Sequence, residues 1–291
     1  MLDPVLLLAI HDLEVVARVT VEGALSGLHR SPFHGYSAEF SQYRHYRPGD
    51  DLKYVDWKLF ARTDRVYTKQ FRETTNLRMQ IVLDASASMG FGAGVSKLEY
   101  ARLVAAGFAH LLVTQGDAVG LMVHDEEIRS YLGARGGRTH LRALLAALSN
   151  VQAQGRTGGT LALRRSIDLL RTRGVLLVLS DLYDDEDGVD AELRRAARIG
   201  HEVIVFPVLT PDEVHPRIRG ATEFEDAETG LRVIAGAAAL VQHQRQMAAF
   251  IERWRDRCAT YGIDYCGART DAPLDATLRG YLLQRGRAPR R

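Results

Sequence analysis

The fold of this chain is decided by the stretch Met79-Gln80-Ile81-Val82-Leu83-Asp84-Ala85-Ser86-Ala87-Ser88-Met89-Gly90. Residues 79–83 form a short apolar run with β-branched residues in its middle, which is typical of a strand buried on both faces of a parallel sheet. The run ends in an acid that is followed by hydroxyls at alternate positions, Asp84, Ser86 and Ser88. In an open α/β sheet ligands bind beyond the carboxyl ends of the strands, so these oxygens predict a binding site there.

The oxygens of this stretch suit a divalent cation. One carboxylate and two neutral hydroxyls match Mg²⁺, which prefers oxygen ligands, keeps several waters and is usually held by one or two carboxylates. The alternative is a strand that simply ends in a polar turn, because Asp and Ser are ordinary turn residues. Taken alone, the segment leaves both interpretations open.

Length and composition place the chain among ordinary globular proteins. It has 291 residues, of which 46% are hydrophobic and 25% are charged, and its net charge is +2. No charge excess therefore points to nucleic acid or a membrane surface. Cys258 and Cys266 are too few for a disulfide framework, and we interpret them as reduced thiols. The apolar run at residues 5–10 is too short to span a bilayer, so we predict a cytoplasmic protein.

Alternating strand and helix patterns predict an α/β fold with a doubly wound, mainly parallel sheet. Ser96 and Glu99 form a capping box that starts a helix running to about residue 114. We expect one amphipathic helix over residues 4–28 near the start of the chain. The predicted division is an N-terminal helix and a small β-rich module in residues 1–76, an α/β domain in residues 77–270 with a hairpin insertion near 219–236, and a C-terminal helix with a basic tail in residues 271–291.

Residues 31–73 are rich in aromatic and basic side chains. Such a mixture occurs in proteins that stack single-stranded nucleic acid, but the acids interspersed here weaken a phosphate-binding surface. We therefore expect a small folded module of short strands with Tyr46, Trp57 and Phe71 in its core. On that expectation, Trp57→Ala destabilises the protein by several kcal/mol through a cavity.

Two further loops reach the edge of the sheet at which Asp84 is expected. Thr160, in Gly158-Gly159-Thr160, starts a predicted helix, and Asp181 follows the apolar strand of residues 175–179. Each residue also has an ordinary structural role, Thr160 as an N-cap and Asp181 as the cap of a turn. The order of the three segments is more informative than either residue alone.

This ordered set resembles the metal-ion-dependent adhesion site of the von Willebrand factor A domain, with Asp84, Ser86, Ser88, Thr160 and Asp181 at its five positions. The remaining motifs are similar to the family catalogued as domain of unknown function 58, in which an upstream hallmark segment precedes a von Willebrand A-like domain. They are Tyr46-Arg47-Pro48-Gly49-Asp50-Asp51, Asp56-Trp57, Ala61-Arg62-Thr63, residues 226–230, residues 262–265 and residues 271–274. Some relatives carry membrane helices before this region, and membrane attachment is not carried over to this chain.

The resemblance implies that the protein works through its metal. Ser86 and Ser88 would ligate the cation, Thr160 would do so directly or through water, and Asp84 and Asp181 would hold ligands or bound waters in place. Few direct carboxylates leave the cation short of negative charge, so an acidic residue of a client protein would complete its coordination. We expect Mg²⁺, with Mn²⁺ or Ca²⁺ as alternatives. Family members are typically encoded beside AAA+ ATPases of the MoxR type, which implies such a partner and a chaperone-like adaptor role.

An enzyme is the rival class. Haloacid-dehalogenase-like phosphatases carry Asp-x-Asp after a strand and use the second acid as general acid; Ser86 stands at that position here and cannot do this at neutral pH. The glycines of residues 90–94 lack the order of a nucleotide-binding loop. We predict a non-enzymatic protein, with a metal-dependent hydrolase and an RNA-particle binding protein as alternatives. Because the site is placed at an exposed sheet edge, Asp84→Ala or Ser86→Ala is expected to leave the fold intact.

Overall fold

The computed structural model describes residues 2–10, 12–26, 37–48, 50–74, 77–216 and 222–287. By their contacts they form two units, Met1–Pro32 with Arg78–Arg291, and Phe33–Leu77. This division differs from the predicted N-terminal unit of residues 1–76, because the first helices group with the sheet. The reason is the apolar stripe of α2 (Leu13–Leu25), which packs against α4 (Lys97–Thr114) of the larger unit and buries Val16 and Val21.

The larger unit is built on a central, mainly parallel sheet. Its strands are β3 (Arg78–Asp84), β4 (Ala118–His124), β5 (Ile128–Arg135), β6 (Val175–Ser180), β7 (Glu202–Leu209), β10 (Asp264–Tyr265) and β11 (Ala268–Arg269). The order is β10-β7-β6-β3-β4-β5, with β11 also on β7, and the one antiparallel pair among these strands is β4 with β5. β6 is buried along its whole length, as expected for a strand covered on both faces. The predicted α/β fold is confirmed.

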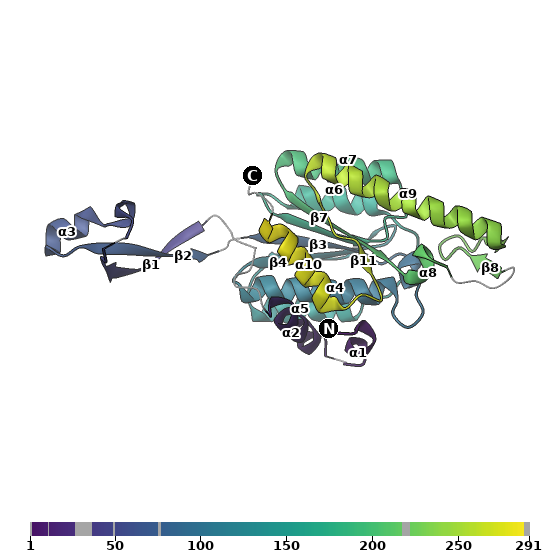
Figure 1. The fold of residues 1–291 in the computed structure, drawn as a ribbon, viewed down its shortest axis with the longest axis horizontal. Coiled ribbons are helices and arrows are strands. Elements are labelled where there is room, and N and C mark those ends of the chain that lie inside the picture. Colours follow the sequence, from purple (N-terminus) through teal and green to yellow (C-terminus); the bar gives the residue numbers. More distant parts are fainter. Residues whose placement is uncertain are drawn as a thin grey trace. The chain divides into compact units, whose positions relative to one another are not determined.

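Helices cover both faces of this sheet (Figure 1). One face carries α4 (Lys97–Thr114) and α5 (Arg138–Ser149), with α2 (Leu13–Leu25) and α10 (Leu274–Arg287) packed against α4. The other face carries α6 (Gly159–Leu169), α7 (Glu186–Ile199) and α9 (Ala237–Tyr261). The rings of Phe108, Phe206 and Tyr281 meet edge to face on the α4 side, with centroids 5.5–5.8 Å apart, and join α4, β7 and α10 into one core.

The N-terminal segment forms two helices, so the prediction of one helix over residues 4–28 is wrong. α1 spans Pro4–Leu8 with Asp3 as its N-cap, and α2 begins separately at Leu13. The carboxylate of Asp12 accepts hydrogen bonds from the backbone N–H groups of Glu14 (2.8 Å) and Val15 (3.4 Å). Such an N-cap satisfies donors that a new helix leaves open, which is why α2 starts there.

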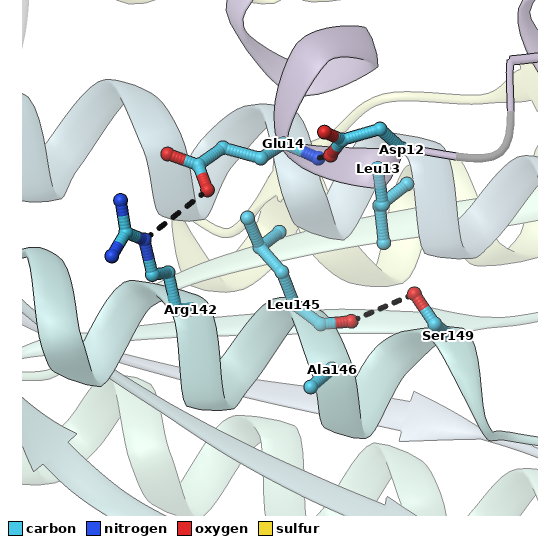
Figure 2. A pocket seen from close by; sticks show the side chains of 7 residues that line it. All are labelled: Asp12, Leu13, Glu14, Arg142, Leu145, Ala146 and Ser149. Atoms are coloured by element: carbon cyan, nitrogen blue, oxygen red, sulfur yellow. Dashed lines mark hydrogen bonds and ion pairs between the residues drawn. The ribbon is translucent and has the colours of Figure 1, made fainter.

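A hollow of about 380 Å³ lies between α2 and α5 (Figure 2). Its charged groups already have partners, because the carboxylate of Glu14 lies 3.5 Å from the guanidinium of Arg142 and Asp12 caps α2. Leu13, Leu145 and Ala146 make up much of the remaining lining. This hollow therefore offers no unpaired chemical group and is not a candidate site.

The smaller unit is a β-hairpin with helical turns between its strands. β1 (Ser37–His45) pairs antiparallel with β2 (Tyr67–Thr74), and the 3₁₀ helix η1 (Leu52–Tyr54) and α3 (Trp57–Thr63) lie between them in sequence. The predicted core position of Trp57 is wrong, because 58% of this residue is exposed. Tyr46 is half-buried, and the side chain of Phe71 lies outside the described ones. Val55 is buried instead, directly before the residue that caps α3.

The acids of the hallmark segment stabilise this smaller unit. Asp56 is the N-cap of α3. Its carboxylate also accepts a hydrogen bond from the Tyr43 hydroxyl (2.8 Å) and forms an ion pair with Lys69 (3.1 Å). Asp50 accepts hydrogen bonds from Arg44 (2.7 Å) and from the backbone N–H of Arg47 (2.9 Å). These contacts assign the two acids a structural role, whereas the exposed Trp57 meets the ring of Phe60 edge to face.

The remaining elements complete the larger unit. They are the 3₁₀ helix η2 (Ala87–Gly90), α8 (Pro211–Val214), β8 (Thr222–Glu225) and β9 (Arg232–Ala235). β8 and β9 form the predicted hairpin. Cys258 and Cys266 are free thiols whose pKa values are raised to about 12 by burial. Among the described helices, none is both long enough and apolar enough to cross a bilayer.

Candidate functional site

The carboxyl ends of β3 and β6 lie side by side, because these two strands are parallel neighbours in the sheet. Asp84 is the last residue of β3, and Asp181 directly follows the last residue of β6. The loop that precedes α6 joins the same edge. The N–H of Ala87 donates to the carbonyl of Gly155, and the N–H of Gln154 donates to the carbonyl of Ala85, both at 2.9 Å. Three loops therefore meet at one end of the sheet.

Four of the five predicted site residues are linked by hydrogen bonds at this edge. The hydroxyls of Ser86 and Ser88 lie 3.1 Å apart, and the Ser88 hydroxyl donates to Oδ2 of Asp181 at 2.7 Å. Oδ1 of Asp84 accepts from the backbone N–H of Ser86 at 2.9 Å, and Oδ2 accepts from the Ser180 hydroxyl at 2.7 Å. We call Asp84, Ser86, Ser88 and Asp181 the oxygen cluster.

The oxygen cluster is more deeply buried than the sequence suggested. Ser86 is fully buried, and 1% of Asp84 and of Asp181 is exposed, while Ser88 is half-buried. The premise of an exposed edge, on which a harmless Asp84→Ala was expected, is therefore wrong. Removing the Asp84 carboxylate would leave the buried donors of Ser86 and Ser180 without their partner, which costs about 1–3 kcal/mol for each unsatisfied group.

Thr160 does not join the cluster in the structure, and Thr157 takes the place expected for it. The Thr160 hydroxyl is buried without a hydrogen-bond partner among the described residues, and it faces α7, where a Cβ added to Gly188 would lie 2.6 Å from it. The Thr157 hydroxyl instead donates to Oδ2 of Asp84 at 3.5 Å. The reason is that α6 begins at Gly159, so Thr160 turns away with the helix while Thr157 stays in the loop.

Lys97 is a member of this site that the sequence argument missed. It is 1% exposed, and its Nζ donates to Oδ2 of Asp181 and to Oε1 of Glu213, both at 2.6 Å. It also lies 5.1 Å from the centre of the Tyr183 ring. Burial alone lowers the pKa of Lys97, but the charges of Asp181 and Glu213 outweigh it and raise the pKa above the ordinary value. The ammonium therefore stays charged and neutralises part of the acidic site.

One sequence signal pointed to Lys97. It is the first residue of α4, directly after the N-cap Ser96. A cation at a helix N-terminus opposes the helix dipole, so a buried lysine there requires acidic partners from elsewhere in the chain. For Thr157 no such signal exists, because it and Thr160 flank the same two glycines.

The donors of the site fit a hard divalent cation. They are hydroxyl and carboxylate oxygens, which suit Mg²⁺ and Ca²⁺. Within the described ranges, no group of three or more Asp, Glu, His or Cys side chains is arranged to hold a metal, so the hydroxyls would have to supply several of the ligands. Burial raises the pKa of Asp84, and the nearby charge of Asp181 acts in the same direction. A cation in the cluster would stabilise the ionised form of Asp84, whose charge is otherwise costly to bury.

Comparison with known proteins places the chain in a family. The family model described as "Protein of unknown function DUF58" matches residues 42–250. The chain belongs to this family. A relative, the uncharacterized protein Rv1480 of Mycobacterium tuberculosis, is 32% identical over 235 residues, which cover 79% of this chain and 73% of the relative. The uncharacterized protein YeaD of Bacillus subtilis is 28% identical over 129 residues, which cover 44% of this chain and 30% of YeaD.

The central sheet of this DUF58 protein is mainly parallel with helices on both faces, as the resemblance implied. Solved structures similar to it include BatB of Bacteroides thetaiotaomicron, with 17% identity, a TM-score of 0.48 and coverage of 73% of this chain and 100% of BatB. Another is the VWA domain of SpRpn10, with 14% identity, a TM-score of 0.41 and coverage of 75% of this chain and 100% of that domain.

Proposed function

We propose that this DUF58 protein is a non-enzymatic, Mg²⁺-dependent protein–protein interaction module. The hydroxyls of Ser86, Ser88 and Thr157 would contact the cation, and the carboxylates of Asp84 and Asp181 would orient these hydroxyls and bound waters. The observation that supports this most directly is the hydrogen-bonded oxygen cluster, to which loops distant in sequence contribute. Mn²⁺ or Ca²⁺ can take the same oxygen donors.

The charge balance of the site supports recognition of an acidic partner. Lys97 already neutralises Asp181, so a bound cation would be only partly compensated by the protein. Such a cation attracts a further anionic ligand strongly, because a divalent charge acts at short range in a partly dry setting. We propose that a carboxylate of a client protein completes the coordination.

The side chains around the cluster support binding better than catalysis. The lysine of the site is held by two carboxylates and its raised pKa keeps it protonated, so it is not a general base at neutral pH. The position that a phosphatase would use for a general acid is occupied by Ser86. As partner we propose an AAA+ ATPase of the MoxR type, for which the protein acts as adaptor or co-chaperone. That assignment is supported by the family resemblance.

Thr157→Val and Thr160→Val make a matched test of the metal site. Both replace a hydroxyl by a methyl group of similar size, but only the Thr157 hydroxyl reaches Asp84. In a thermal melt, Mg²⁺ at 100 times its Kd stabilises the wild type by about 2.7 kcal/mol. We expect Ser88→Ala and Thr157→Val to lower the Mg²⁺ affinity, whereas Thr160→Val keeps it. A wild-type melting temperature that ignores millimolar Mg²⁺ would contradict the proposal.

Affinity capture from a native lysate tests the partner. We expect the wild type and Thr160→Val to retain an AAA+ ATPase in Mg²⁺ and to lose it in a chelator. Thr157→Val and Ser88→Ala should retain less of it in Mg²⁺. Equal retention of the ATPase with and without chelator would show that the contact does not use the metal.

A further inference from the structure

The turn of the β8–β9 hairpin is built to hold Glu228 in a defined position. The carboxylate of Asp226 accepts hydrogen bonds from the backbone N–H groups of Glu228 (3.0 Å) and Thr229 (2.7 Å). Gly230 adopts φ +69°, a conformation that side-chain-bearing residues rarely take, and its N–H donates to the carbonyl of Asp226 at 2.8 Å. These local bonds fix the backbone at the tip of the hairpin.

Glu228 reaches the oxygen cluster through Thr157. The backbone N–H of Thr157 donates to Oε2 of Glu228 at 3.3 Å, while its hydroxyl donates to Asp84. Oε1 of Glu228 is buried and has no hydrogen-bond partner in the described part of the chain. Leaving a carboxylate oxygen buried and unpaired is costly, so this atom lacks a ligand that the site is suited to bind.

Glu228 lies within reach of the charges of the acids that would surround the proposed cation, because Thr157 bonds to both Glu228 and Asp84. Burial raises the pKa of Glu228, and the charges of Asp181 and Asp84 act in the same direction. Carboxylates that repel one another in a buried site are stabilised together by one divalent cation.

The hairpin is not anchored by a core of its own. β8 and β9 pair with each other and, in the described chain, with no strand of the central sheet. Four large apolar residues of the hairpin are exposed to between 41% and 74%: Phe224, Leu231, Val233 and Ile234. Among the described residues, the bond between Thr157 and Glu228 is the one hydrogen bond between the hairpin and the loops of the cluster. Release of the tip from the cluster would therefore break this one hydrogen bond and no strand pairing of the central sheet.

We infer that Glu228 is an internal ligand of the metal site, where its carboxylate takes the coordination position that a partner's carboxylate would otherwise fill. A partner must then displace the hairpin tip in order to bind, so the hairpin holds the resting protein closed. This inference rests on the proposed metal site. Three hydroxyls and one carboxylate would contact the cation, which is consistent with the absence of a three-acid cluster among the described residues.

Glu228→Ala tests the inference, with Glu225→Ala as control. Glu225 lies on the same hairpin, but its carboxylate is exposed and pairs with Arg232 at 2.8 Å within the hairpin. The probes are Mn²⁺ and acetate, and the readouts are the Mn²⁺ affinity by electron paramagnetic resonance and the water-proton relaxation per bound ion. We expect Glu228→Ala to bind Mn²⁺ roughly tenfold more weakly and to relax water more strongly, because water replaces the carboxylate. Acetate should reverse that gain in the variant and change little in the wild type or in Glu225→Ala.

The outcomes separate this inference from the proposed function. A wild type that binds no Mn²⁺ would overturn the metal site itself. A wild type that binds Mn²⁺ with the same affinity, relaxation and acetate response as Glu228→Ala would overturn only the role of Glu228. An equal effect of Glu225→Ala would show that the hairpin acts by its general charge, which also overturns that role.

Discussion

Replacing Lys97 by Met is the most direct test of the electrostatics of the site. Met keeps the length and most of the volume of the side chain but removes the ammonium. The substitution leaves the carboxylate of Asp181 buried, and that of Glu213 largely buried, without the cation that lies 2.6 Å from each. We expect the folded protein to lose stability even though no apolar contact is removed.

The expected loss follows from the burial of the pair. Breaking a buried ion pair by removing one partner typically costs about 3–5 kcal/mol, because the remaining charge is uncompensated. For a domain of this size, each kcal/mol shifts the melting temperature by roughly 2–4 °C. The Lys97→Met protein should therefore melt roughly 6–20 °C below the wild type in the absence of divalent metal.

The assay is a thermal melt and a urea titration in chelator, with Arg255→Met as the matched control. Arg255 pairs with Glu252 on α9, where more than half of both side chains is exposed. An exposed pair of this kind contributes about 0–1 kcal/mol, so the control should melt close to the wild type. If Lys97→Met loses no more stability than Arg255→Met, the buried ion pair is not formed as described and the argument on charge balance fails.

Three further predictions concern the metal and the smaller unit. Mg²⁺ should raise the melting temperature of Lys97→Met more than that of the wild type, because the lost positive charge no longer opposes the cation; an equal or smaller rise would place the cation elsewhere. Trp57→Ala should change the free energy of unfolding by less than about 1 kcal/mol, since the ring is mostly exposed, and a loss of several kcal/mol in a urea titration would contradict its exposure. Hydrogen bonds from the backbone of Leu59 and the hydroxyl of Tyr43 lower the pKa of Asp56 in the folded protein. The ionised carboxylate therefore stabilises the smaller unit fully above the unfolded pKa of about 3.9, and this stabilisation is lost as the pH falls from there through the lower folded pKa. Near-ultraviolet circular dichroism of the full chain should show this loss of stability as a change in signal when the pH is lowered. Asp56→Asn should make the smaller unit less stable at neutral pH and make the signal depend less on pH.

Much of the architecture was readable from local pattern. α9 begins and ends where its helical pattern does, and the unbroken apolar run of β6 is the strand that the sheet buries on both faces. Asp84 and Asp181 were predicted to meet because each stands at the carboxyl end of such a strand, and parallel neighbours bring those ends together. The end of each strand can be read from local pattern, and the pairing of β3 with β6 then brings the two acids together.

The two threonines show where this reasoning ends. Thr157 and Thr160 stand on either side of Gly158-Gly159, and a helix could begin at any of these positions on local propensity. The choice is made by packing, because a Cβ at Gly158 would lie 2.7 Å from the carbonyl oxygen of Glu126, in the loop after β4. Only glycine fits at position 158 against this loop, and α6 begins at the next residue, Gly159. Thr157, which precedes the two glycines, is therefore the threonine that reaches Asp84.

The amino-acid sequence by itself determined most of the strands and helices and the four residues of the oxygen cluster at the sheet edge. It did so because burial and hydrogen-bonding periodicity act over a few residues. Only the tertiary structure decided which charges surround those oxygens, since Lys97 meets acids 84 and 116 residues away and Glu228 meets Thr157 across 71 residues. A buried polar group takes whatever partner the folded chain brings within about 3 Å, and no local pattern encodes that partner.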